Sequence, residues 1–197
     1  MEKAKIQFAP NVLLVDAVGL DRTVAGLARY FSGRIGRDLP KADLATLLEC
    51  LLLDAGLPSD ANQEIQVIFV YEGGEERMQA CVPSQLQKEL NEVGFDSPLG
   101  RFSLYAFQPS GMATREELFA ETLLLLGESK EAVRVLLVPD TDAYTEEWKK
   151  ALGAVRKKEQ VVQFGMNQPT GETVGRFEQL GFSVLQALGI RSDELER

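Results

Sequence analysis

The chain has 197 residues, a length that suits one α/β domain, and it contains no histidine and only two cysteines. This composition excludes Ser-His-Asp and Cys-His catalysis, histidine-ligated zinc, and a zinc site built from these two cysteines alone. A net charge of −9 argues against passive coating of nucleic acid or of an anionic membrane, and the lack of an apolar run that could span a bilayer or serve as a signal peptide predicts a cytoplasmic protein.

The first half of the chain predicts alternating strands and helices. An apolar run at residues 11–16 predicts a buried strand, after which Asp21 is expected to cap the first helix. A leucine stripe over residues 44–52 predicts the second helix. Residues 65–71 predict the second strand, and a third helix is expected to end at Gly94, its C-cap.

The second half continues the same alternation. Residues 102–107 predict a strand whose polar alternation is typical of an edge or near-edge position. Thr114 and Glu117 resemble a capping box at the start of the next helix. The remaining predicted elements are a strand at 133–138, a helix at 145–158, a strand at 161–164 and a final helix at about 174–188.

This order of elements predicts an α/β fold, a three-layer sandwich around a mainly parallel sheet of five strands. The sequence contains no internal repeat, low-complexity segment or interdomain linker, so residues 1–197 are expected to form a single domain. Its core would cover about residues 11–165, followed by a C-terminal helix and a polar tail. If the strands at 11–16 and 133–138 are neighbours, their carboxyl ends meet at a topological switch point, where open α/β sheets bind ligands.

Three aspartates stand where those two strands end: Asp16, Asp140 and Asp142. Converging carboxylates would repel one another unless a cation or a substrate group lay between them. Carboxylates suit magnesium or manganese, and such a metal can activate water for phosphodiester hydrolysis without histidine. The three acids are therefore candidate metal ligands and catalytic residues. Alternatively, Asp16 caps a turn and the other two cap the next helix, because acids favour helix N-termini.

Several segments resemble the NYN domain of the PIN-like metal-dependent ribonuclease superfamily. The strand that ends at Asp16 is similar to that family's first strand, which also ends in an aspartate. Residues 135–144 resemble its strand ending in Ser-Gly-Asp-Ser-Asp-Phe, and further similar segments lie at residues 41–44 and 86–95. The resemblance covers most of residues 11–165. It implies a PIN-like fold and a magnesium- or manganese-dependent ribonuclease that acts on RNA.

The chain also departs from that family. Gly19 lies in the region where the family usually carries asparagine, and the family's two aspartates before the fourth strand are replaced by glutamates at different spacing. Whether other acids join the site is open, and the candidates are Glu116, Glu117, Glu121 and Asp54. Because an incomplete acid cluster binds metal more weakly, the alternative is a catalytically degenerate PIN-like interaction protein that forms a homodimer or binds another protein. A phosphohydrolase of small substrates at the same acids is a third interpretation. The whole chain also resembles an uncharacterised bacterial family, which implies no function.

Basic residues could hold phosphates beside the acids. Arg22 follows the first strand and Lys149 lies on the helix after the fourth, so both are candidate nucleic-acid-binding residues. The alternative for Lys149 is a solvated helix face, which the neighbouring Glu146 and Glu147 favour. The loop at residues 165–171 either binds an anion through backbone amides or is an ordinary connection. No phosphate-binding glycine signature is present, so no nucleotide cofactor is expected.

Overall fold

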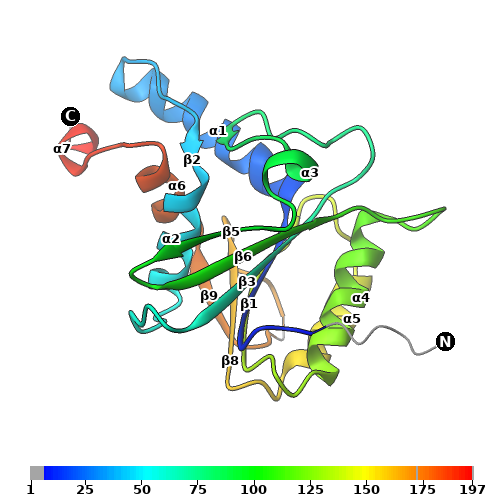
Figure 1. Cartoon of the computed structure of the whole chain (residues 1–197). Helices are drawn as coiled ribbons and strands as arrows, with labels where there is room; N and C mark the ends of the chain where they lie inside the picture. Colours follow the sequence, from blue (N-terminus) through cyan, green and yellow to red (C-terminus); the bar gives the residue numbers. More distant parts are fainter. Residues whose placement is uncertain (1–6, 172, 197) are drawn as a thin grey trace.

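A computed structural model describes residues 7–171 and 173–196, which fold around a mostly parallel seven-stranded sheet (Figure 1). The strand order is β5-β6-β3-β1-β7-β8-β9, and only β5 runs antiparallel to its neighbour. The strands are β1 Asn11–Asp16, β3 Glu64–Val70, β5 Val93–Ser97, β6 Gly100–Phe107, β7 Arg134–Val138, β8 Gln160–Gly165 and β9 Arg176–Gln179. A separate two-stranded sheet pairs β2 Ala42–Asp43 with β4 Cys81–Val82.

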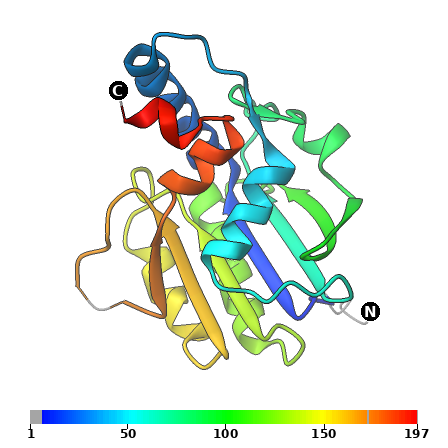
Figure 2. The same ribbon diagram turned by 90° about the vertical axis from the view of Figure 1, so that its left-hand side faces the viewer.

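Helices cover both faces of the sheet and complete a three-layer α/β sandwich (Figures 1 and 2). One face is covered by α1 Ala17–Ile35, α2 Leu44–Asp54 and α6 Gly181–Ala187. The other is covered by α4 Arg115–Glu128, α5 Glu147–Leu152 and the 3-10 turn Gly153–Val155. Alternate strand residues enter two separate cores, so that Leu13 packs toward α2 while Leu14 packs toward α4. The short helices α3 Leu86–Glu89 and α7 Ser192–Leu195 lie outside these layers (Figure 1).

The mainly parallel α/β architecture is confirmed, but the predicted count of five strands is two too few. The third predicted helix is only four residues long, and Gly94, its expected C-cap, lies in the edge strand β5. At the other edge, part of the predicted helix at 174–188 is the strand β9. Both additional strands are short and polar, and each pairs with one neighbour only, so neither shows the apolar signature of a buried strand.

Helix α1 begins earlier than the sequence indicated. Asp16, and not Asp21, is its N-cap, because the Asp16 carboxylate accepts a hydrogen bond from the Gly19 backbone N–H. Asp21 lies inside the helix, and its carboxylate accepts hydrogen bonds from the backbone N–H groups of Gln79 and Ala80. The predicted capping box of Thr114 and Glu117 is present at the start of α4. None of the helices formed by the described residues is both long and apolar enough to cross a membrane.

Two parts of the sheet face toward α4 and α5 are thinly covered. Burial alternates along β6: Phe102, Leu104 and Ala106 belong to the core that α2 also enters, whereas Tyr105 and Phe107 on the opposite face are more exposed and line a groove beside α4. The second thin place follows β8. Parallel strands normally need a crossover of about a dozen residues or more, usually a helix, but β8 and β9 are joined by ten residues, and the described ones among them form no helix.

Candidate functional site

The carboxyl ends of the first and fourth predicted strands were expected to meet if these strands are neighbours, and the structure shows that the two strands, β1 and β7, are neighbours. Strands β1 and β7 pair in parallel with Val15 opposite Val138. Asp16, at the end of β1, and Asp140, just after β7, therefore lie at the same edge of the sheet. The Asp16 and Asp140 residues are only 0% and 2% exposed, whereas the Asp142 side chain is 80% exposed. Two of the three predicted acids are therefore deeply buried, and burial of a carboxylate requires a compensating partner.

Arg115, the first residue of α4, supplies that partner. Its side chain is 9% exposed, its Nε lies 3.1 Å from Asp16 Oδ2, and its Nη2 donates to Asp140 Oδ2 at 3.0 Å. The guanidinium therefore lies between the two carboxylates, in the place where the sequence led us to expect a metal ion. Its Nη1 is 4.0 Å from Glu72 Oε1, and neither Nη1 nor Nε makes a hydrogen bond with a described residue.

A second arginine neutralises the outer part of the cluster. Arg22 on α1 donates to Asp140 Oδ1, and its Nη2 lies 3.7 Å from Asp142 Oδ2. Asp140 is thus shared by two guanidinium groups, one buried and one half-exposed. Arg22, Asp140 and Asp142 line a hollow of about 60 Å³ at this edge, a volume too small to enclose a nucleotide.

Neutral groups complete the shell of Asp16. Its Oδ1 accepts the Gly19 N–H at 2.7 Å, and its Oδ2 accepts the hydroxyl hydrogen bond of Tyr144. The Arg115 guanidinium carbon lies 5.9 Å from the centre of the Tyr144 ring, a cation–π distance. Tyr144 therefore contacts both the Asp16 carboxylate, through its hydroxyl, and the Arg115 guanidinium, through its ring.

Gly19 permits the close approach of α1 to the end of β7. A Cβ at this position would lie 2.7 Å from Asp140 Cβ, closer than nonbonded carbon atoms approach. Any side chain at residue 19 would have to displace Asp140. The glycine thus belongs to the packing of the acid cluster.

Burial raises the pKa of Asp16 to about 6. The hydrogen bonds from Gly19 and Tyr144 and the charge of Arg115 act in the opposite direction but are outweighed by burial. The carboxylate at residue 16 therefore changes protonation in weakly acidic solution. The pKa of Tyr144 is raised above its ordinary value, first by burial and then by the Asp16 charge.

The other candidate acids take no part in this cluster. Glu116 accepts from Thr145 and Trp148, Glu117 serves the capping box, and Asp54 accepts from Ser183 on α6. Glu121 lines an apolar groove beside α4. Lys149 pairs with Glu146 at 3.0 Å and lines a different hollow from the acids. Of the two predicted cationic residues, only Arg22 lies with the aspartates.

Arg115 is the main residue that the sequence analysis did not select. A cation at the first position of a helix is unfavourable beside the positive end of the helix dipole. The capping box had located that position, so an arginine directly after Thr114 was a local inconsistency that pointed to a buried acidic partner.

The residues present do not fit a bound magnesium or manganese ion. A metal ligated by Asp16 and Asp140 would have to displace the guanidinium that already contacts both. Among the described residues, no three Asp, Glu or Cys side chains are grouped closely enough to share a metal. We therefore derive no catalytic step through a metal.

Fold and site together define an α/β protein with an arginine-neutralised acid cluster at the switch point of its sheet. Over residues 5–195 the chain matches DUF6621, a family of unknown function, and it belongs to that family. Neither the curated proteins nor the solved structures contain a match.

Replacing Arg115 by methionine should destabilise the fold by about 3–5 kcal/mol, because two buried carboxylates lose their shared cation. The measurement is the free energy of unfolding in urea. Arg22→Met is the matched control, and it should cost less than about 1 kcal/mol because the Arg22 side chain is 49% exposed. Equal losses in the two variants would contradict the central role of Arg115.

The raised pKa of Asp16 predicts a pH dependence of stability. The folded state holds the Asp16 proton up to about pH 6, whereas the ordinary value is 3.8. Protonation of Asp16 therefore stabilises the folded state fully below about pH 3.8, and this stabilisation is lost as the pH rises toward about 6. Relative to Asp16→Asn, the wild type should lose up to about 3 kcal/mol across this window. Asp142→Asn changes an exposed side chain and should show the same pH dependence as the wild type. If the difference in stability between the wild type and Asp16→Asn does not change with pH, the raised pKa of Asp16 is refuted.

Proposed function

We propose that this protein is a catalytically degenerate, PIN-like interaction protein, in which an arginine takes the place of the metal. The observation that carries the proposal is the position of the Arg115 guanidinium between Asp16 and Asp140. A permanent side-chain cation neutralises the acids but brings no water to activate, so it supplies the stabilising charge of a metal without its hydrolytic chemistry.

The resemblance to NYN domains supports the same conclusion. That family supplies additional acids from the helix before its fourth strand, and the corresponding helix here is α4, whose first residue is the buried Arg115. At the start of this helix Arg115 places a cation in contact with both strand-end aspartates. Gly19 further lets Asp140 pack tightly against α1, which favours a closed cluster over an open metal site.

The alternative proposal is a magnesium- or manganese-dependent ribonuclease that uses Asp16, Asp140 and Asp142. Its support is that these acids do gather at the carboxyl edge, with Asp142 exposed to solvent and Arg22 beside it. It requires Arg115 to leave the cluster when metal and RNA bind. Wild-type cleavage of single-stranded RNA that needs manganese and disappears in Asp140→Asn would establish it.

Manganese provides the direct test of the first proposal. We expect Mn²⁺ to leave the melting temperature of the wild type unchanged, because Arg115 already satisfies the carboxylates. In Arg115→Ala the two acids lose the cation that they share, and Mn²⁺ should raise the melting temperature by binding the folded state alone. The double variant with Asp140→Asn is the control and should lose this response. Stabilisation of the wild type by Mn²⁺ would overturn the proposal.

An interaction protein needs a binding surface, and the uncovered face beside α4 offers one. An apolar groove of about 480 Å³ runs between α4 and strands β3 and β6. Phe8, Ile68, Tyr105 and Phe107 line its sheet side, and Phe107 is 48% exposed. Leu118 and Leu125 contribute from the helix.

We propose a second copy of this chain as the occupant of this groove. Two copies that each carry a net charge of −9 repel one another over most of their surfaces. The groove is the exception, because Glu121 is the only charged side chain among the described residues that line it. Contact through this face therefore buries aromatic surface at little electrostatic cost, and a two-fold arrangement would bring the same patch from both chains together.

Sedimentation should accordingly show a concentration-dependent dimer. Phe107→Glu places a charge in the centre of the groove and should shift the protein to monomer at all concentrations. Phe182→Glu is the matched control: Phe182 on α6 is 68% exposed and lies on the other side of the sheet, so this variant should dimerise like the wild type. A wild type that remains monomeric would refute the dimer while leaving the Arg115 argument intact.

A further inference from the structure

Met112 is the most exposed large apolar side chain among the described residues, at 99%. It stands in a turn of the connection between β6 and α4. The Ala113 N–H donates to the Ser110 carbonyl at 3.3 Å and closes this turn, and Gly111 supplies the positive φ of 65°. Thr114, the N-cap of α4, follows directly. The backbone of Met112 is therefore held in place and loses little freedom when its side chain becomes buried.

Met112 lies on the same face of the molecule as the apolar groove between α4 and strands β3 and β6. Glu121 lines that groove, and it also lines a hollow on the outer side of α4 that Met112 and Leu124 border. Glu121 therefore stands between Met112 and the groove. In its own chain Met112 does not line the groove and remains in solvent. A protruding apolar side chain and an apolar groove thus lie side by side on one surface.

Two-fold symmetry determines how two such surfaces fit together. A half-turn about an axis that is normal to this face and midway between Met112 and the groove exchanges the two positions. Met112 of each copy then lies over the groove of the other copy, so both grooves are filled in one closed contact. This arrangement leaves no unfilled groove that could recruit a further chain.

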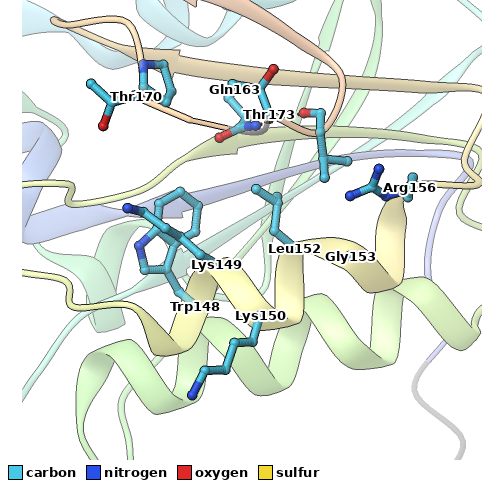
Figure 3. Close-up of a pocket in the computed structure, with 11 residues that line it drawn as sticks. Trp148, Lys149, Lys150, Leu152, Gly153, Arg156, Gln163, Thr170 and Thr173 are labelled. Carbon is cyan, nitrogen blue, oxygen red and sulfur yellow. Dashed lines mark hydrogen bonds between the residues drawn. The ribbon is translucent and has the colours of Figure 1, made fainter.

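We propose that Met112 of each copy is the side chain that occupies the groove of the other copy in the dimer. This inference rests on the proposed dimer and names the contact that forms it. Tyr105 and Phe107 give the groove aromatic walls, and a thioether sulfur makes favourable contacts with aromatic rings. The hollow beside α5 suits a methionine less well, because the polar side chains of Gln163 and Lys149 border it (Figure 3).

The same symmetry brings the Glu121 side chains of the two copies close to the axis and to each other. Like charges repel, so Glu121 opposes the contact that Met112 promotes. Glu121→Gln should therefore strengthen the dimer about threefold. Glu128→Gln makes the same change farther along α4 and is the matched control for net charge, so it should leave the dimer nearly unchanged. A dimer that is unchanged or weaker in Glu121→Gln would contradict this arrangement.

Two exposed methionines provide a matched pair of variants for sedimentation of the full-length protein. Met112→Ser should raise the dimer dissociation constant about a hundredfold, because each dimer loses two buried methionine side chains that contribute about tenfold each. Met166→Ser is the control, since Met166 follows β8 and does not line the groove, and it should dimerise like the wild type. Met112→Ser should keep the melting temperature of the monomer, because its side chain makes no contact in its own chain.

Carbon-13 labelling of the methionine methyl groups tests the contact directly. The chain has four methionines, and the Met112 signal is assigned by its loss in Met112→Ser. This signal should move upfield as protein concentration rises, in step with the dimer fraction, because the methyl group enters a groove with aromatic walls. Met78, 2% exposed in the opposite core, is the internal reference and should not move. A dimer in which the Met112 signal stays in place overturns this inference and leaves the dimer standing, whereas a protein that remains monomeric overturns both.

Discussion

The buried carboxylates of Asp16 and Asp140 impose the constraint around which this end of the fold is built. A charge removed from water is tolerated only with a close opposite charge and with hydrogen bonds to its remaining lone pairs. Arg115 provides the charge, and Gly19, Tyr144 and Arg22 provide the hydrogen bonds. These groups come from α1, α4 and the segment after β7, so one electrostatic requirement aligns helices on opposite faces of the sheet.

The topological switch point of this sheet is filled by side chains of the protein itself. In open α/β sheets the carboxyl edge is normally where a ligand completes the structure. Here the chain completes it with its own side chains, and the remaining hollow of about 60 Å³ is small. Other concave surfaces lie over the strands to either side of the central pair, beside β6 and beside β8.

The sequence predicted the fully buried strands well and the partly exposed strands poorly. The apolar runs of β1 and β7 predicted two buried strands that each lead to an aspartate. That Asp16 and Asp140 share an edge depended on these strands being neighbours, which the structure shows. The edge strands β5 and β9 escaped prediction because a strand with one partner needs no apolar run. Arg115 was missed for a different reason. Spacing along the chain reveals acids at strand ends, but the cation that neutralises them comes from a helix far away in sequence.

That separation bears on how the chain folds during synthesis. The hydrogen bonds that join Asp16 to Tyr144 and Arg22 to Asp140 span 128 and 118 residues. Strand β1 leaves the ribosome early, yet its terminal carboxylate has no neutralising partner until α4 and the end of β7 have also emerged. The N-terminal half can therefore form its leucine-rich helices, but closing the sheet around a charged Asp16 must wait for the second half. Until then the exposed edge of β1 is a surface that chaperones would be expected to protect.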